Sequence, residues 1–175
     1  MSSLQITLVA VAAVLVFWAV GAYNRLMRLR SAILRAFAPV DQQLGLRHTL
    51  LQHQIDLLVP VLTEQPENLS ALRAACTQAQ AARAHASTHP GAAGALNSLR
   101  LTEDILLETR ARLPAPDDTR AELTALAAQL AVVDTALLFA RGRFNKGVME
   151  YNHAVQQFPT RLLAGLFGFR AAGVF

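Results

Sequence analysis

The sequence predicts an all-α protein in which an N-terminal transmembrane helix continues into an antiparallel four-helix bundle. Three observations lead to this fold class. The first charged side chain is Arg25, so the chain opens with an uncharged, apolar stretch. Apolar residues then recur every three or four positions over long distances, as they do on one face of a helix. No stretch alternates apolar and polar residues in the way that marks a β-strand.

The composition favours a membrane protein and disfavours a nucleic-acid-binding one. Hydrophobic residues make up 53% of the 175 residues and charged residues 16%, which is more apolar than an ordinary soluble domain. The net charge of +4 permits an anionic partner. Because the basic residues are scattered and not gathered in a stripe with aromatic residues, we expect no nucleic-acid partner. A single cysteine, Cys76, rules out an internal disulfide.

The apolar stretch Ile6–Ala22, "ITLVAVAAVLVFWAVGA", is predicted to cross the membrane. Extended by Leu4 and Gln5, it reaches the lower length limit of a spanning helix at about 1.5 Å per residue. A cleaved signal peptide is the alternative interpretation. The stretch is longer than the usual apolar core of a signal peptide, and no basic residue precedes it. We therefore expect residues 1–22 to remain as a transmembrane anchor.

The charges that follow the anchor predict its orientation. Basic residues are enriched on the cytoplasmic side of membrane segments. This bias predicts a single-pass protein of the cytoplasmic (inner) membrane, with its N-terminus outside and its bundle in the cytoplasm. Trp18 and Tyr23 are expected at the inner headgroup layer, where aromatic side chains gather. The arginines that carry the prediction are Arg25, Arg28, Arg30 and Arg35.

Four helices are expected after the anchor and make up a cytoplasmic bundle over residues 23–158. The first continues straight out of the membrane, is kinked at Pro39 and ends at Pro60. The second covers about 67–86, the third ends near Arg112, and the fourth carries an apolar stripe over about forty residues up to Phe158. An elongated rod with a coiled-coil seam is the alternative architecture.

Alternating helix directions bring Phe158 back to the level of Tyr23. Since both long helices rise about 1.5 Å per residue, the numbers of facing residues should sum to roughly 181. This register predicts three pairs in particular: Phe37 with Phe144, and the inter-helix charge pairs Asp41 with Arg141 and Arg47 with Asp134.

Residues 159–175 form an apolar, membrane-proximal tail, because they follow the fourth helix where it returns to the headgroups. We expect this tail to lie in the membrane interface. Anionic lipids would be drawn to the same place by Arg25, Arg28 and Arg30. The alternative is that the tail packs across the open end of the bundle. The predicted interfacial side chains of the tail are Leu162, Leu166, Phe167 and Phe169.

No catalytic, metal-binding or cofactor-binding residue is predicted. The sequence has no nucleotide-binding, zinc-protease or paired-cysteine motif. His85 and His89 have the spacing of two metal ligands on a helix, but no carboxylate or cysteine nearby completes a site. We interpret them as a solvated helix end, and expect no cofactor.

Two further groups of polar residues are interpreted as structural. His53 and Asp56 share one helix face, with His48 farther along, and are expected to form a hydrogen-bonded surface cluster because no nucleophile accompanies them. Cys76 lies among alanines and is expected to be a small core residue.

Two stretches are similar to the signature blocks of the LemA family. They are "YNRLMRLRSAILRAFAPVDQQL" at 23–44 and "LLFARGRFNKGVMEYNHAVQQFPTRLLAGLFGF" at 137–169. The resemblance implies a single-pass membrane protein with its N-terminus outside and a cytoplasmic helical bundle. It brings no established enzymatic activity.

Two functional hypotheses follow. The first is a non-enzymatic, membrane-anchored scaffold or adaptor that organises protein partners or copies of itself. Self-association is expected because the two long helices carry apolar stripes that the short helices, of about 20 residues each, are too short to cover. The second hypothesis is a lipid-binding or membrane-shaping accessory protein that acts through its apolar tail.

Overall fold

The computed structural model describes residues 2–60, 66–113 and 121–175, and within these ranges it contains five helices and no strand. The all-α fold class is therefore confirmed, together with an apolar helix at the N-terminus. The helices are α1 (Ser3–Leu58), α2 (Pro66–Thr88), α3 (Ala93–Ala111), α4 (Ala121–Gln156) and α5 (Thr160–Leu166).

Helix α1 is a single helix of 56 residues that runs from the predicted anchor into the body of the protein. It begins with a capping box, in which the Ser2 hydroxyl and the Gln5 side chain each bond to the other residue's backbone N–H. It continues through Pro39, which lies on the exposed side of the helix, so the carbonyl that loses its donor is on the solvent side. Leu58, two residues before Pro60, is its last residue.

Among the described residues, α1 and α4 are long and apolar enough to cross a membrane. The apolar window of α1 has a mean hydropathy of 2.3 and is 6% buried, whereas that of α4 has a mean hydropathy of 1.8 and is 28% buried. The part of α4 that precedes Arg141 runs beside α1 from about Asp41 onward, about 28 Å along α1 from Ala22. One bilayer therefore cannot cover both apolar windows at the same level.

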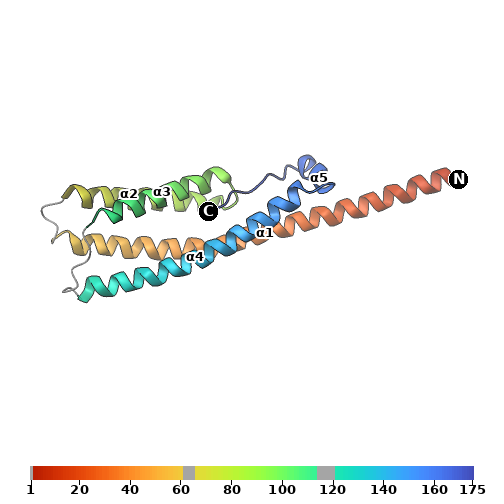
Figure 1. The fold of residues 1–175 in the computed structure, drawn as a ribbon. Helices are drawn as coiled ribbons and strands as arrows, with labels where there is room; N and C mark the ends of the chain where they lie inside the picture. The colour runs from red at the N-terminus through yellow and green to blue at the C-terminus, as the bar shows by residue number, and fades with distance from the viewer. Residues whose placement is uncertain (1, 61–65, 114–120) are drawn as a thin grey trace.

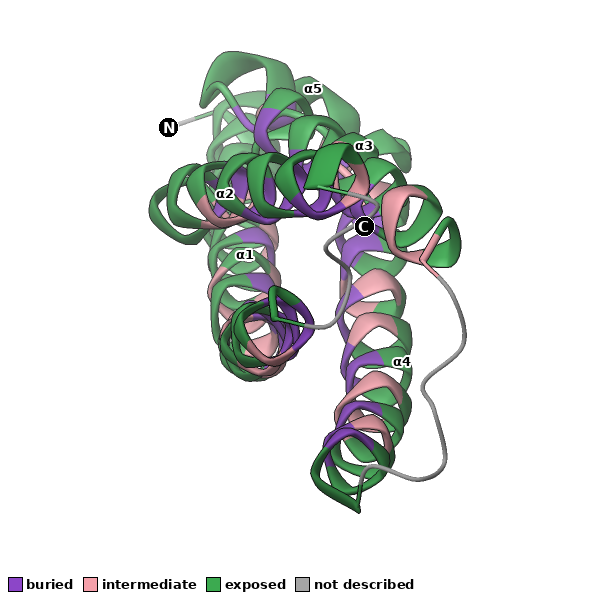
Figure 2. Ribbon diagram, turned by 90° about the vertical axis from the view of Figure 1, so that its left-hand side faces the viewer, coloured by how far each residue is buried: buried purple, intermediate pink, exposed green. Residues whose placement is uncertain are grey.

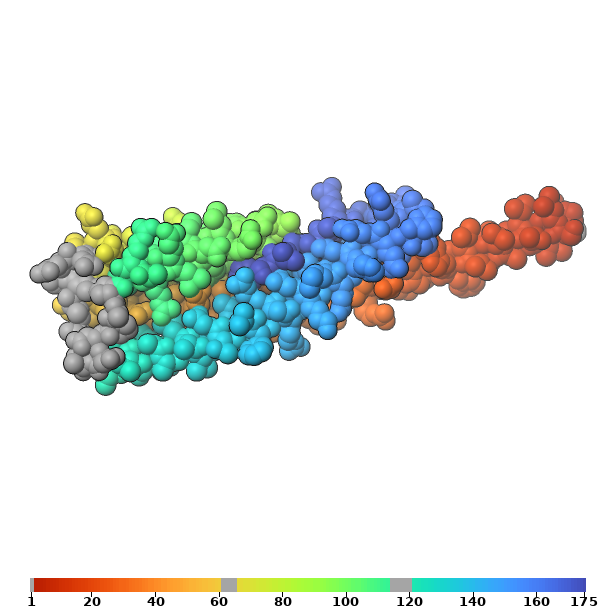
Figure 3. Space-filling view, in the orientation of Figure 1, coloured from red at the N-terminus to blue at the C-terminus, as the bar shows by residue number. Residues whose placement is uncertain are grey.

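The helices form two antiparallel pairs (Figure 1). Helix α4 packs along the second half of α1, while α2 and α3 form a hairpin that contacts α1 through α2. Helix α5 contacts both α1 and α4. Within the described ranges, the backbones of α3 and α4 do not approach each other closely. After α5, the chain runs back beside α4 to the turn between α2 and α3 (Figures 1 and 3). The antiparallel four-helix bundle that the sequence predicts is therefore not confirmed.

Buried side chains lie on the sides of the helices that face one another (Figure 2). The register of α1 against α4 agrees with the predicted sum of 181. The rings of Phe37 and Phe144 meet edge to face with centroids 5.4 Å apart. Leu51 and Leu130 share a second group of buried residues farther from the N-terminus. Helix α1 thus presents its first third to its surroundings and its remaining length to the protein core.

Candidate functional site

An aromatic cluster holds the end of α5 beside α1 where the apolar stretch of α1 ends. The Tyr23 ring contacts Phe167 with centroids 5.1 Å apart and Phe169 with centroids 5.7 Å apart, both edge to face. Such contacts favour a fixed geometry between rings. Because Tyr23 directly follows Ala22, this cluster fixes α5 at the predicted level of the inner headgroups.

Most of the predicted interface residues are exposed. Phe169 is the exception, since it is buried against the body. The reason is Gly168, whose φ of 70° turns the chain back immediately after α5 in a conformation that glycine adopts without strain. The exposed residues of the predicted set are Trp18, Tyr23, Arg25, Arg28, Arg30, Leu162, Leu166 and Phe167.

After Gly168 the chain is extended along α4 and is held by two asparagines. The Asn152 side chain donates to the Ala172 carbonyl (2.9 Å) and accepts from the Ala172 N–H (2.7 Å). Asn145 makes the same pair of bonds with the backbone of Phe175. A carboxamide can do this because it carries one acceptor and one donor side by side, like a peptide group.

The spacing of the two asparagines matches the spacing of the residues that they bind. Asn145 and Asn152 are seven residues apart on a helix, which is about 10.5 Å. Ala172 and Phe175 are three residues apart in extended chain, which is about 10 Å. The side chains of α4 thus bind the backbone of the extended segment at two points, and the Tyr151 hydroxyl adds a third contact by donating to the Arg170 carbonyl (3.0 Å).

The far side of the extended segment contacts the turn between α2 and α3. The Gly173 N–H donates to the Gly91 carbonyl (3.3 Å). A Cβ atom at Gly173 would lie 2.6 Å from the Cα of Ala93, so only glycine fits this close approach. Phe175 is buried, and the Arg141 guanidinium lies 4.4 Å from its ring centroid in a cation–π contact. Residues 169–175, here called the C-terminal strap, therefore join α4 to the turn between α2 and α3.

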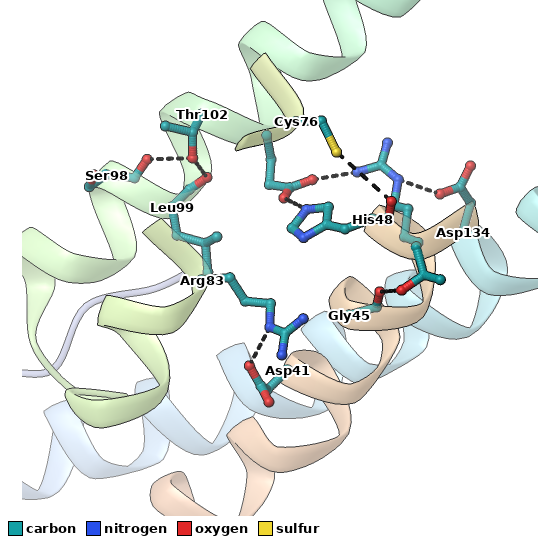
Figure 4. A network of polar contacts seen from close by, with 12 residues as sticks. Asp41, Gly45, His48, Cys76, Arg83, Ser98, Leu99, Thr102 and Asp134 are labelled. Carbon is teal, nitrogen blue, oxygen red and sulfur yellow. Dashed lines mark hydrogen bonds and ion pairs between the residues drawn. The ribbon is translucent and has the colours of Figure 1, made fainter. Parts of the chain in front are cut away.

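A buried ionic network joins the four longer helices (Figure 4). The carboxylate of Glu103 on α3 accepts from Arg47 and bonds to His48 Nε2 (2.6 Å), both on α1. The Arg47 Nε lies 2.9 Å from Asp134 on α4. The Cys76 thiol of α2 lies 3.8 Å from the His48 carbonyl and donates to it. Arg47, His48 and Glu103 are each at least 95% buried.

The charges of the network require one another. A buried ion costs several kcal/mol of desolvation, and only its partners offset that cost. Arg110 of α3 adds a second cation 3.9 Å from Asp134, and burial lowers the pKa of this guanidinium while Asp134 opposes the shift. Burial also raises the pKa of the Cys76 thiol, with a smaller contribution in the same direction from Glu103. Cys76 is therefore a neutral core residue, as the sequence predicts.

The predicted surface cluster of histidines is wrong for His48, which is almost fully buried. The other two members point to other helices: His53 lies 3.8 Å from Glu122 of α4, and Asp56 pairs with Arg73 of α2 at 3.1 Å. Sequence reasoning also missed Glu103. Its position between Leu99 and Leu106, on the buried side of α3, is the signal that could have identified it.

Of the two predicted charge pairs, Arg47–Asp134 is present and Asp41–Arg141 is not. The Asp41 carboxylate accepts from Arg83 of α2 at 2.9 Å. The Arg141 guanidinium instead makes a cation–π contact with the Phe175 ring. The register that produced both pairs is correct, but α2 and the C-terminal strap offer closer partners on the same side of the two long helices.

His85 and His89 stack with ring centroids 4.9 Å apart at the exposed end of α2. The His89 Nδ1 lies 2.9 Å from the Thr88 hydroxyl. No group of three or more metal-ligating side chains occurs in the parts of the chain that the structure describes.

The family model described as "LemA family" matches residues 36–175, which include the ionic network, both asparagines and the C-terminal strap. The chain belongs to the LemA family. No curated protein and no solved structure matches it. The LemA match begins within α1, so the predicted membrane anchor precedes the matched region.

The ionic network predicts that Glu103→Gln will strongly destabilise the body. The substitution keeps the shape of the side chain but leaves the Arg47 charge without its buried partner, which should cost about 3–5 kcal/mol of unfolding free energy. The matched control is Glu108→Gln on the same helix, whose pair with Arg112 is exposed and should change stability by at most about 1 kcal/mol. Denaturant unfolding of the full chain in mild detergent, followed by circular dichroism, measures both. Equal losses for the two variants would contradict the role given to the network.

Proposed function

We propose that this LemA-family protein is a non-enzymatic scaffold that holds partner proteins or copies of itself at the cytoplasmic face of the membrane that α1 crosses. The observation that carries the proposal is the continuity of α1, whose 56 residues correspond to about 84 Å of helix. Its bare apolar part is suited to lipid, and its second part supplies one side of the protein core. Leu26, four residues after Ala22, is already fully buried.

The continuity of α1 matters because a rigid helix fixes the position of the body relative to the membrane segment. A flexible linker would let the body rotate and move away from the bilayer, whereas a continuous helix keeps the body at one height. The aromatic contacts of Tyr23 with α5 join the body to the same helix a second time, close to the predicted membrane surface. The exposed faces of α3 and α4 are then presented to the cytoplasm at a defined distance from the lipid. That is the property a scaffold needs.

The proposed orientation predicts which introduced cysteines can be labelled in intact cells. A cysteine at Ser3 should react with a membrane-impermeant maleimide, while one at Ser98, exposed on α3, should react only after lysis. The native Cys76 should stay unlabelled in both cases, because its thiol is buried and its pKa is raised. Labelling of Ser98→Cys from outside would overturn the orientation.

The outer face of α4 is the surface best suited to a second copy of the chain. Val132 and Phe139 are each 70% exposed and lie seven residues apart, on the same face of α4. Phe139 also lines a groove with Pro39 of α1, whose charged residues are Arg35, Arg143, Lys146 and Glu150. Exposed apolar surface of this kind marks protein contact sites.

A charged residue at the centre of this face should reduce self-association. We expect Phe139→Lys to lower the mass of the particle in mild detergent, because it places a charge in the proposed interface. Leu101→Lys, a change of similar size at an exposed site on α3, should leave the mass unchanged. Light scattering of the full-length variants is the measurement. A wild-type protein that is strictly monomeric would contradict self-association through α4. An equal change in particle mass for both variants would also contradict it.

A second candidate function is membrane shaping through α5. The observation that favours it is the run of exposed apolar side chains of this short helix, Leu162 at 67% and Leu166 at 77%, next to Tyr23. Apolar side chains that enter one leaflet at the headgroup level wedge lipids apart and respond to curvature.

The double substitution Leu162→Ser with Leu166→Ser separates the two candidates, because it leaves the C-terminal strap and α1 intact. Membrane shaping predicts that wild-type protein deforms phosphatidylglycerol-containing vesicles and that this variant does not. Leu101→Ser with Leu107→Ser, two exposed sites on α3, is the control. Vesicle diameters measured by electron microscopy decide the question. Vesicles left unchanged by wild-type protein would rule out this second function.

A further inference from the structure

A cavity of about 680 Å³ lies between α1, the turn that joins α2 to α3, and the C-terminal strap. This volume is in the range of small-molecule binding sites. Its polar lining includes the side chains of Arg30 and Arg170, and its apolar lining includes Ile33, Leu34 and Phe169. The cavity is therefore cationic on one part of its wall and apolar on another.

The two arginines of the cavity are not neutralised by the protein. No Asp or Glu lines the cavity among the residues that the structure describes. Neither Arg30 nor Arg170 has a carboxylate within 4 Å in the same described ranges, whereas five other arginines do, namely Arg47, Arg73, Arg83, Arg110 and Arg112. Arg30 also faces the buried Tyr151, another residue of the wall: burial raises the pKa of the Tyr151 hydroxyl, and the charge of Arg30 opposes that shift. Two unpaired guanidinium groups at one cavity are suited to a phosphate group, which they can bind with charge-assisted hydrogen bonds.

The first turn of α3 adds to the positive potential of the wall. Ala92, the N-cap residue, and Ala93 both line the cavity, and no side chain caps this helix end. The N-terminus of a helix carries a partial positive charge, which favours an anion. This contribution is secondary to the two full charges of the arginines.

The cavity begins at the predicted height of the lipid headgroups and extends away from the membrane. Phe169 both lines the cavity and contacts Tyr23, the residue that follows the apolar stretch of α1. Arg30 is seven residues farther along α1, or about 10 Å. The headgroup layer on each side of a bilayer is about 5–7 Å thick. The Phe169 end of the cavity is thus nearest the lipid surface, and Arg30 lies just beyond the headgroup layer.

We propose that this cavity binds one anionic phospholipid, with the headgroup phosphate between Arg30 and Arg170 and the upper part of the acyl chains against Phe169, on the membrane side of the arginines. The inference rests on the membrane placement of α1 in the proposed function, but not on a scaffold role. A free phosphate ion shares the chemistry that the arginines recognise. The apolar wall is what selects the lipid, since an inorganic ion leaves that wall unused.

The C-terminal strap makes the site, because Arg170, Ala171 and Ala172 form one wall of the cavity. This wall is held in place by the bonds from Asn152 and Tyr151 to the strap backbone. Anything that binds the structure with the strap in place stabilises the strap by mass action. A bound lipid should therefore protect the amides of the strap from hydrogen exchange.

The test uses the full chain in nonionic detergent, with short-chain phosphatidylglycerol as the probe and native mass spectrometry to count bound lipid. The double variant Arg30→Gln with Arg170→Gln should lower the lipid association constant by roughly tenfold or more, since each arginine near an anionic headgroup adds an attraction. The matched control, Arg28→Gln with Arg161→Gln, removes the same charge from α1 and α5 outside the cavity and should bind within about twofold of wild type.

A second measurement does not depend on the variants. Phosphatidylglycerol should slow hydrogen exchange of the Ala172 and Phe175 amides in wild-type protein, whereas phosphatidylcholine, which carries no net charge, should not. Equal weakening by the two double variants, or unchanged strap exchange, would overturn the proposal. Displacement of the lipid by millimolar inorganic phosphate would assign the cavity to a soluble anion and overturn the lipid assignment. If the introduced cysteines at Ser3 and Ser98 are labelled as expected but no lipid binds, only the cavity proposal is wrong. If the labelling is reversed but lipid still binds, only the proposed orientation is wrong.

Discussion

Helix α1 has an exposed apolar part and a part that packs in the protein core, and the rest of the structure depends on the continuity of these two parts. Helix α1 is bare and apolar over its first third, yet from Leu26 onward it supplies the surface on which α4 and α2 pack. Because no break separates these parts, every element that packs on α1 acquires a fixed height above its apolar N-terminal part. Tyr23 marks the boundary, and α5 is held to that residue by Phe167 and Phe169. The function proposed for the body is a consequence of this fixed height.

Two different devices hold the body together along α1. In the ionic network, Glu103 of α3 binds Arg47 and His48 of α1, and Asp134 of α4 supplies a second carboxylate to Arg47. Ion pairs therefore join the α2–α3 hairpin to α1 and α4. Nearer the membrane, the C-terminal strap joins α4 to the turn between α2 and α3 by backbone hydrogen bonds. The first device is specific because buried charges tolerate few arrangements. The second is specific because the amide groups must match in spacing.

Periodicity and helix geometry predicted what is local or repeats regularly. The helices follow from the apolar periodicity, and the facing of Phe37 with Phe144 follows from the constant rise of a helix and the alternation of chain direction. The same reasoning failed where a third element supplies the partner. Asp41 bonds Arg83, and His48 turns inward to Glu103, because α2 and α3 approach α1 from a side that no pairwise register describes. The asparagines of α4 were likewise missed, since their partners are backbone groups, which leave no trace in a side-chain pattern.

The C-terminal strap also bears on the order in which this protein can be completed. Residues 170–175 leave the ribosome after all five helices, yet they join α4 to the turn between α2 and α3. Until they arrive, α4 can pair with α1, and the hairpin can pack against α1, but the core cluster that contains Ala95 and Phe144 lacks Phe175. Closure of the body is thus a late, single event of synthesis. A chain that stalls just short of its strap would expose apolar surface to quality-control proteases even though all of its long helices are formed.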